Sequence, residues 1–269
     1  MPSFSEISVS QLARLMGTPD APTLIDVRID EDFALDPRLI PAAIRLSHKN
    51  IADIARAAGT SAVIICQGGL KLSHGVAAQL RAQGIAAEAL EGGFEAWGAA
   101  DLPLVPAAAI PALQSGSTLW VTRHRPKIDR IACPWLIRRF VDPGARFLFV
   151  PPRDVKGVAD RFGATPFDVE DVAFSHQGDQ CSFDTMLQTF ALNTAPLFEM
   201  AKVIRGADTN RHDLAPQAAG LLALSVGLSR MYRDDMEQLD AGMLIYDALY
   251  RWARDGLNEG HDWPNGAPA

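Results

Sequence analysis

The chain has 269 residues, of which 48% are hydrophobic and 21% charged, so it is long enough for two ordinary domains with separate cores. Its formal net charge of −7 argues against a nucleic-acid partner, because nucleic-acid-binding surfaces are strongly basic. No segment approaches the roughly 20 apolar residues that cross a bilayer, and the first residues lack the pattern of an export signal. We therefore expect a cytoplasmic protein without a membrane partner.

Three cysteines, Cys66, Cys133 and Cys181, lie far apart in the sequence. Wide spacing without a close pair fits reduced thiols better than a disulfide framework. Each cysteine therefore has to be interpreted by its own surroundings.

Short apolar runs alternate with helical patterns through the first hundred residues. Strands are predicted over 23–27 and 62–66, and helices over 10–16 and 72–83, with Gly84 ending the second helix. This alternation predicts a parallel sheet flanked by helices.

The composition changes at residues 102–117, which are rich in proline, alanine, glycine and serine and predict a linker. Strands are predicted over 118–122 and 146–150, and the remaining patterns are mainly helical. Pro134 suggests that one helix begins there, and residues 218–231 form another, with Pro216 in its first turn. Apolar side chains spaced by three and four residues predict a core-facing stripe on a final helix: Met236, Leu239, Met243, Tyr246 and Tyr250.

These patterns predict four segments in the chain. They are a domain at 1–105, a linker at 106–117, a second domain at 118–256, and a tail at 257–269. The end of the tail is polar and rich in glycine and proline, so we expect it to be frayed.

Cys66 stands between a predicted strand and the helix that follows it. The unpaired amides and the positive dipole at a helix N-terminus favour a thiolate, a persulfide or a bound oxyanion. Glycines let the backbone curve around such a group, Lys71 adds a cation, and Ser73 is either a hydroxyl donor or a helix cap. The alternative is a buried structural cysteine. The substrate-binding residues that we expect beside Cys66 are Gln67, Gly68, Gly69, Leu70, Lys71 and Ser73.

Three ordered segments resemble the rhodanese family, over roughly residues 5–105. They read Leu-Ile-Asp-Val-Arg at 24–28, Glu-Asp-Phe at 31–33, and Leu-Glu-Gly-Gly-Phe-Glu-Ala-Trp at 90–97. The resemblance implies an α/β domain with a parallel sheet, in which Cys66 takes sulfur from a thiosulfate-like donor as a persulfide and passes it to a thiol acceptor. It also implies that Asp26 and Arg28 form a structural ion pair near the site.

The sequence departs from the rhodanese pattern at three points. Lys71 stands where arginine is common, and Arg38-Leu39 replace the usual Gly-His before Ile-Pro. The segment after Cys66 also aligns as one residue longer than usual. A longer loop suits a larger tetrahedral oxyanion, so arsenate, phosphate or chromate stays open as the ligand.

Six cations and one acid lie between residues 123 and 139. One hypothesis is an oxyanion site, because guanidinium groups match tetrahedral oxygens. The other is a solvated helix face whose long side chains cover apolar surface. The cations are Arg123, Arg125, Lys127, Arg130, Arg138 and Arg139, and the acid is Asp129.

A polar loop at 174–184 holds His176, Cys181 and Asp184 and precedes a predicted helix that Ser182 would cap. Imidazole and thiolate are ligands of zinc, iron and copper, so one hypothesis is a metal or redox site using these three residues. No CxxC or HxxxH pair supports it, and a purely structural loop stays open. A zinc or iron ion here is the one cofactor that we consider. A third polar cluster of mixed charge lies at residues 205–213, between two predicted helices. It fits a hydrogen-bonded turn as well as it fits a site.

Four ordered segments, at 120–123, 126–140, 176–184 and 203–209, resemble the C-terminal domain of the ChrB chromate-resistance proteins, over about 118–254. The resemblance implies an association with chromate resistance without naming a reaction, in a mainly α (α+β) domain. Regulatory members carry a different N-terminal half, so we do not expect direct transcriptional regulation. The candidate site in this domain comprises Arg123, His124, Lys127, Asp129, Arg130, Cys133, Asp208 and Arg211.

Taken together, the sequence predicts a rhodanese-type sulfurtransferase associated with chromate resistance or oxyanion detoxification, with Cys66 as the persulfide carrier. The alternative is a non-catalytic oxyanion- or metal-binding sensor or regulatory module. In the first case the partner is a sulfur donor and a thiol acceptor, and in the second it is an oxyanion.

Overall fold

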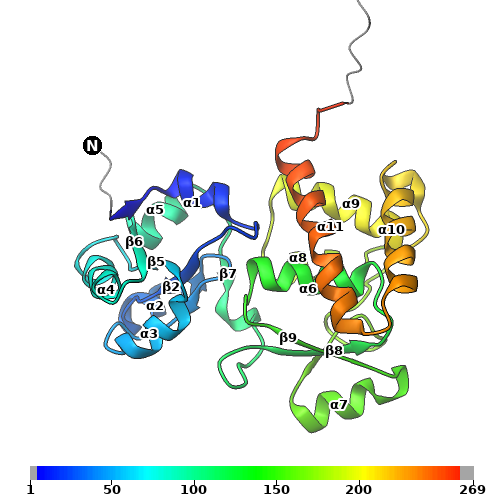
Figure 1. The fold of residues 1–269 in the computed structure, drawn as a ribbon, viewed down its shortest axis with the longest axis horizontal. Helices are drawn as coiled ribbons and strands as arrows, with labels where there is room; N and C mark the ends of the chain where they lie inside the picture. Colours follow the sequence, from blue (N-terminus) through cyan, green and yellow to red (C-terminus); the bar gives the residue numbers. More distant parts are fainter. Residues whose placement is uncertain (1–4, 261–269) are drawn as a thin grey trace, which may run out of the picture.

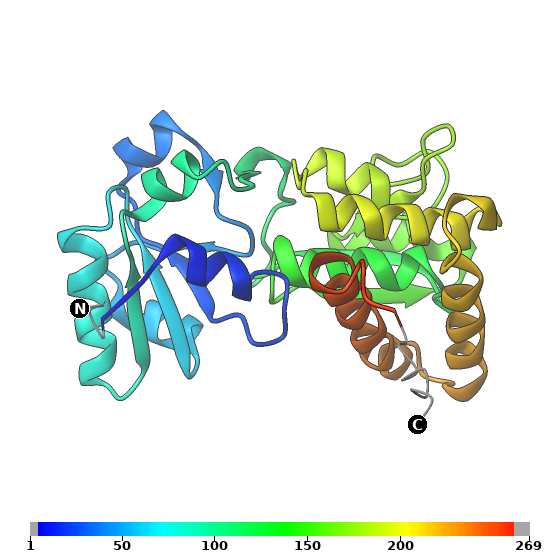
Figure 2. The same cartoon turned by 90° about the horizontal axis from the view of Figure 1, so that it is seen from above.

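The computed structural model describes residues 5–260, so most of the tail expected to be frayed, residues 261–269, lies outside the described part. Two lobes lie side by side: residues up to about 105 form the blue-to-cyan lobe and residues from 118 onward form the green-to-red lobe (Figures 1 and 2). Within the described residues, no helix combines the length and apolar character that crossing a lipid bilayer requires.

The N-terminal lobe is a five-stranded parallel sheet flanked by helices, as predicted. Its strand order is β1-β6-β5-β2-β4. The strands are β1 (Glu6–Ile7), β2 (Thr23–Asp26), β4 (Ile44–Arg45), β5 (Ser61–Ile65) and β6 (Ala86–Leu90). The helices are α1 (Val9–Leu15), α2 (Asp30–Leu35), α3 (Ile51–Ala58), α4 (Lys71–Ala82) and α5 (Gly93–Ala99).

Alternate residues of β5 enter two separate apolar cores, because successive side chains of a strand point to opposite faces. Val63 and Ile65 pack in one cluster with Leu12 of α1 and Trp97 of α5. Ile64 packs in the other cluster, beneath α3 and α4. Cys66 continues the alternation and belongs to this second cluster.

Asp26 and Arg28 form the structural ion pair that the rhodanese resemblance implied. Arg28 Nη2 lies 2.7 Å from Asp26 Oδ2, and both side chains are almost completely buried. Arg28 also donates to the carbonyl oxygens of Asp36 and Arg38, and its guanidinium lies 3.7 Å from the centre of the Phe94 ring. The buried guanidinium of Arg28 thus connects the loop after α2 to the end of β2.

The C-terminal lobe places helices around a three-stranded parallel sheet with the order β10-β8-β9. The strands are β8 (Leu119–Arg123), β9 (Arg146–Val150) and β10 (Thr165–Pro166). The helices are α6 (Asp129–Phe140), α7 (Val155–Phe162), α8 (Ser182–Thr189), α9 (Ala195–Asp208), α10 (Ala218–Met231) and α11 (Asp235–Asp255). The stripe on α11 faces the core as predicted: Leu239, Met243, Tyr246 and Tyr250 are buried, and Met236 packs against them.

Three sequence predictions about helix starts are wrong. Pro216 lies in a turn before α10, which begins at Ala218, and not in the first turn of that helix. Pro134 lies inside α6, because the Ile128 carbonyl accepts the amides of Ile131 and Ala132 and starts the helix at Asp129. Ser182 is the first residue of α8 and not its cap. Cys181 occupies the cap position, and its amide donates to Asp184 Oδ2 at 3.0 Å. The Ser182 hydroxyl donates instead to the carboxylate of Asp168.

The two lobes meet in direct contact. The Ala42 amide donates to the Phe140 carbonyl at 2.8 Å, and Arg254 donates to the Arg14 carbonyl at 2.9 Å. Gly17 has a φ of +73°, and a methyl group there would collide with the rings of Phe140 and Tyr250. The segment expected as a linker contains a 3₁₀ turn at Ala107–Ala109, and its Ile110 packs against the cores of both lobes. Because Phe140 is the last residue of α6, this helix ends at the junction between the lobes.

Candidate functional site

The Cys66 thiol lies where β5 passes into α4. Its Sγ accepts the Leu70 amide at 3.2 Å and lies 3.2 Å from the Ser73 hydroxyl oxygen. The Ser73 hydroxyl also lies 3.0 Å from the Leu70 carbonyl and can donate to it. Because Ser73 has a single proton, it can donate to Leu70 while the thiol is neutral and to the sulfur when the sulfur is anionic.

The loop around the thiol is held by the first turn of α5. The amide of Phe94 donates to the Cys66 carbonyl and that of Glu95 donates to the Gln67 carbonyl, both at 3.0 Å. Gly69 has a φ of +66°, and a methyl group there would lie 2.6 Å from the Leu90 carbonyl. Loop and helix thus fit closely only because glycine stands at this point.

Cys66 itself is only 4% exposed, with apolar neighbours on the side of the core. Leu70 and Lys71 are exposed at the outer side of the loop, and Gln67 donates to Glu95 at 3.1 Å. The thiol therefore combines an apolar wall on one side with two polar donors on the other.

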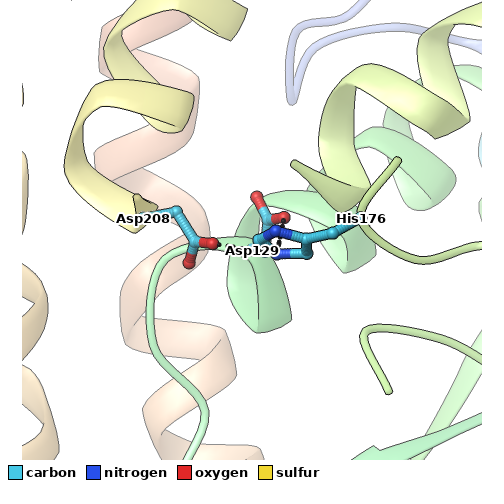
Figure 3. A group of neighbouring side chains, drawn as sticks. All are labelled: Asp129, His176 and Asp208. Atoms are coloured by element: carbon cyan, nitrogen blue, oxygen red, sulfur yellow. Dashed lines mark ion pairs between the residues drawn. The ribbon is translucent and has the colours of Figure 1, made fainter. Parts of the chain in front are cut away.

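The second cluster is assembled around the imidazole of His176 in the C-terminal lobe. His176 Nε2 lies 3.1 Å from Asp208 Oδ2, 3.5 Å from Asp168 Oδ1 and 3.7 Å from Asp129 Oδ2. Figure 3 shows Asp129 at the start of α6, Asp208 at the end of α9, and His176 projecting between them from a loop. Three carboxylates from separate elements thus face one ring.

Asp129 is completely buried at the N-terminus of α8. Its Oδ2 accepts the amides of Ser182 at 2.5 Å and Phe183 at 3.3 Å. Its Oδ1 is also buried and has no hydrogen-bond partner among the residues that the structure describes. Burial, followed by the charges of Asp208 and Asp168, raises the pKa of the Asp129 carboxyl well above its usual range.

Asp168 has the largest set of partners in the cluster. Its Oδ2 lies 3.0 Å from Arg123 Nη2 and 3.2 Å from Arg130 Nε, and its Oδ1 accepts the Ser182 hydroxyl at 2.9 Å. Burial raises the pKa of Asp168, but hydrogen bonds from His176 and Ser182 and the two arginine charges outweigh burial and lower it. Asp168 is therefore the carboxylate that the arginines hold ionised.

The hydrogen bonds with Asp168 and Asp208 raise the pKa of His176 to about 10, against the opposing effect of burial. The His176 side chain remains 40% exposed. The carboxylates thus attract positive charge to a ring that solvent can reach.

The backbone is strained immediately before Asp129. Ile128 has a φ of +43°, which is rare for a β-branched residue. Its amide donates to Ser225 Oγ at 3.2 Å, and its carbonyl accepts the Tyr246 hydroxyl at 3.0 Å. Contacts from α10 and α11 therefore hold the strained residue that places Asp129.

Comparison with known proteins assigns a family to each lobe. The model of the ChrB C-terminal domain matches residues 120–253, and the model of the rhodanese-like domain matches residues 8–100. The chain joins a rhodanese-like domain to a ChrB C-terminal domain. Cys66 lies in the first domain, and the whole cluster around His176 lies in the second.

Individual relatives match one domain each. Protein ChrB of Cupriavidus metallidurans is 36% identical over 132 residues, which are 49% of this chain and 39% of that protein. A rhodanese-like domain protein from Staphylococcus aureus is 31% identical over 35% of this chain and 91% of its own, with a TM-score of 0.31. A thiosulfate sulfurtransferase from Pseudomonas aeruginosa is 28% identical over 38% of this chain and 19% of its own, with a TM-score of 0.32. The chain thus spans less than half the length of Protein ChrB.

The ChrB C-terminal domain distributes its run of cations among separate partners. Arg125 donates to the Tyr232 carbonyl, and its amide donates to Asp235. Arg139 pairs with Asp247 at 2.8 Å and Arg138 with Asp240 at 3.4 Å. These three side chains bind α10, α11 and the turn between them, and only Arg123 and Arg130 reach the His176 cluster.

The other predicted residues of the ChrB C-terminal domain lie apart from this cluster or deep beneath it. Cys133 is fully buried, and burial raises the pKa of its thiol well above the usual range. His124 is exposed, and Arg211 pairs with Asp213 on the surface. Lys127 makes no ion pair or side-chain hydrogen bond within residues 5–260.

His176, Cys181 and Asp184, the residues considered for a metal, have different partners. Asp184 Oδ1 accepts Arg205 Nη1 at 2.8 Å, while its Oδ2 accepts the Cys181 amide. Cys181 is buried, and burial raises the pKa of its thiol strongly. Within the described residues, the His, Cys, Asp and Glu side chains spaced to share an ion are Asp129, His176 and Asp208.

Sequence reasoning missed Asp168 and assigned Ser182 only a capping role. Asp168 follows β10 with a φ of +51°, in a stretch without helical or strand periodicity. An aspartate in a left-handed turn is common and marks no site by itself. The pattern thus offered no signal that this residue would reach Arg123 at the end of the neighbouring strand β8.

Proposed function

We propose that the protein is a sulfurtransferase of the rhodanese type, with Cys66 as its sulfur carrier, and that it acts in chromate resistance. The observation that carries the first part is the pair of donors at the sulfur. The Leu70 amide and the Ser73 hydroxyl both lie 3.2 Å from Cys66 Sγ, at the start of α4. Donors at a helix N-terminus favour an anionic sulfur over a neutral one.

The reaction proceeds in two displacements at one sulfur atom. The Cys66 thiolate attacks the outer sulfur of thiosulfate, the S–S bond of the donor breaks, and sulfite leaves with the electron pair. The resulting persulfide carries its negative charge on the outer sulfur. A thiolate acceptor then attacks that outer sulfur and takes it, and Cys66 leaves as the thiolate.

We assign different parts of the loop to binding of the sulfur donor. The Leu70 amide donates to the thiol, and we expect the neighbouring loop amides to bind the oxygens of the donor or of a similar oxyanion. Lys71 is exposed beside them and supplies a mobile cation. Glu95, held by Gln67, adds a negative charge beside the loop, which opposes an anionic donor and an anionic product alike.

The link to chromate resistance rests on the second domain. Residues 120–253 match the ChrB C-terminal domain, and the match lies entirely outside the rhodanese-like domain. An oxyanion site at the run of cations has less support, because Arg125, Arg138 and Arg139 already have partners. The chromate association therefore predicts a phenotype for the whole chain and names no reaction.

Mass spectrometry of the full chain tests sulfur transfer. After incubation with thiosulfate and removal of the donor, the peptide containing Cys66 should gain one sulfur atom. The buried Cys133 and Cys181 of the same sample serve as internal controls. Cyanide should then release the sulfur as thiocyanate, and Cys66→Ala should abolish both signals.

The rival function is oxyanion sensing without turnover. It would be favoured by saturable calorimetric binding of chromate, arsenate or sulfate to a protein that forms neither persulfide nor thiocyanate. The chromate association is tested separately, by expressing the wild-type chain in a chromate-sensitive bacterium. Unchanged growth on chromate would remove that part of the proposal.

A further inference from the structure

With a neutral imidazole, the His176 cluster contains three acids against the two arginines beside it. Asp129, Asp168 and Asp208 supply three carboxylates, and Arg123 and Arg130 both pair with Asp168. Within residues 5–260, neither Asp129 nor Asp208 makes an ion pair with a lysine or arginine. A proton on His176 balances this charge, and a metal ion bound to the neutral imidazole would take the place of that proton beside Asp129 and Asp208.

Asp129 also carries a buried oxygen without a hydrogen bond. The residue is 0% exposed, and Oδ1 has no partner among the described residues although Oδ2 accepts two amides. A buried acceptor without a partner is costly, so native proteins normally supply a proton, a water or an ion. This oxygen is the second, independent indication of a ligand.

The spacing of the side chains is close to the coordination shell of a metal and slightly wider than it. Ligand atoms about 2.0–2.2 Å from one ion lie roughly 3.0–3.6 Å from each other in octahedral or tetrahedral geometry. His176 Nε2 lies 3.1 Å from Asp208 Oδ2 and 3.7 Å from Asp129 Oδ2. The candidate ligand atoms of all three residues lie within 4.8 Å of one another.

We propose that Asp129, His176 and Asp208 bind one divalent first-row metal ion. One imidazole and two carboxylates form a mixed nitrogen and oxygen set, which suits zinc(II), iron(II) or manganese(II) better than a thiolate-selective metal. Asp168 Oδ1 lies 3.5 Å from the same nitrogen, but Ser182 and the two arginines already hold this carboxylate, so we place it outside the set.

The framework around the three residues positions them for such an ion. Asp129 is fixed by the α8 amides, and Asp208 is the last residue of α9, where the negative end of the helix dipole attracts a cation. The side chains of His176 and Asp208 are 40% and 18% exposed, which gives the ion a path from solvent. Asp129 is then the buried ligand, and the other two are the ligands that solvent reaches.

Metal binding to the chelator-treated full chain tests this proposal, with zinc chloride and manganese chloride as the probes. Calorimetry should give one equivalent of zinc or manganese per chain in the wild type. His176→Gln and Asp208→Asn should each weaken binding at least about tenfold. Both residues are partly exposed, so these changes avoid the folding defect expected at Asp129.

His212→Gln and Asp213→Asn are the matched controls. They change the same two residue types, on an exposed turn shortly after α9, and should bind metal as the wild type does. Circular dichroism and persulfide formation at Cys66 should be unaltered in all four variants. That readout separates loss of the metal site from failure of the sulfur-transfer proposal.

Two results would overturn the metal site. One is the absence of stoichiometric zinc or manganese binding to the wild type. The other is equal binding by His176→Gln, Asp208→Asn and the controls, which would assign the metal to other residues. Either result would leave the cluster as a salt-bridge network around a protonated imidazole.

Discussion

The two domains both bury ionised groups, but they balance the charge in different ways. In the rhodanese-like domain one arginine, Arg28, meets one aspartate, Asp26, and the Cys66 thiol faces two neutral donors. In the ChrB C-terminal domain, three carboxylates gather around one imidazole, with two arginines concentrated on a single aspartate. The first arrangement is complete within the chain, whereas the second is suited to accept a cation.

This difference in charge balance matches the two roles proposed above, a sulfur carrier in one domain and a metal site in the other. A sulfur that alternates between thiolate and persulfide carries one negative charge, and main-chain amides stabilise it without adding a competing ion. A metal ion needs several anionic or neutral ligands from different directions, so its residues come from separate elements. The changes below test this contrast, from the largest expected effect to the smallest.

Arg28→Met should cause the largest loss of stability. It leaves Asp26 buried without its partner and removes the donors to the Asp36 and Arg38 carbonyls. We expect the free energy of unfolding of the N-terminal domain to fall by about 3–5 kcal/mol, measured by hydrogen exchange of the β5 amides. The double change Asp26→Asn/Arg28→Met should recover part of this loss. A loss of free energy of unfolding below about 1 kcal/mol would show that the Asp26–Arg28 ion pair does not stabilise the domain.

Gly93→Ala should disrupt the thiol loop. Gly93 has a φ of +60°, and a methyl group there would collide with the Cys66 carbonyl and the Gly69 amide. We expect destabilisation of about 1–3 kcal/mol by denaturant titration, with loss of persulfide formation. Gly75→Ala is the matched control, because it lies in α4 with open space around it and should stabilise the helix by about 0.5–1 kcal/mol. Equal effects of the two changes would contradict the tight packing of the loop against α5.

Ser182→Ala should destabilise the His176 cluster while leaving its three carboxylates in place. The change removes the 2.9 Å hydrogen bond to Asp168 but leaves the Ser182 amide on Asp129. A hydrogen bond to a charged group contributes about 1.5–3 kcal/mol, and urea unfolding should report a loss in that range. Gln188→Ala removes an exposed hydrogen bond on the same helix and should change stability by less than about 0.5 kcal/mol.

Ser73→Ala should have the smallest effect, on rate and not on fold. Without the hydroxyl, the anionic sulfur keeps only the Leu70 amide among the donors described for it. We expect persulfide formation from thiosulfate to slow about tenfold, which corresponds to about 1.4 kcal/mol. Ser61→Ala, at the exposed start of β5, should leave the rate unchanged. An unaltered rate in Ser73→Ala would assign the thiol's activation to the backbone alone.

The sequence grouped the residues of the Cys66 loop better than those of the His176 cluster, for a physical reason. Cys66, its loop and α4 are consecutive, so the strand period, the glycines and the helix period identify them together. The fold of this domain follows from the same alternation. By contrast, Asp129 and Asp208 are 79 residues apart (208 − 129), and only tertiary packing brings them to His176.

Local rules failed where tertiary contacts dominate. Pro134 suggested a helix start, but the Ile128 carbonyl, held by Tyr246 of α11, begins the helix at Asp129. Asp184 was grouped with His176 because they are close in sequence, yet Arg205 of α9 holds its carboxylate. In both cases a partner distant in sequence determines the geometry, and no pattern within the segment records it.

Helix α6 begins with a residue of the charged cluster and ends with a residue of the interdomain contact. Its 12 residues span about 18 Å, from Asp129 to the Phe140 carbonyl that accepts the Ala42 amide. Neither domain is therefore a self-contained fragment: cutting the chain between them would uncover the rings of Phe140 and Tyr250 that close over Gly17. Loss of solubility from this exposed surface would therefore precede any loss of chemistry in the separated halves.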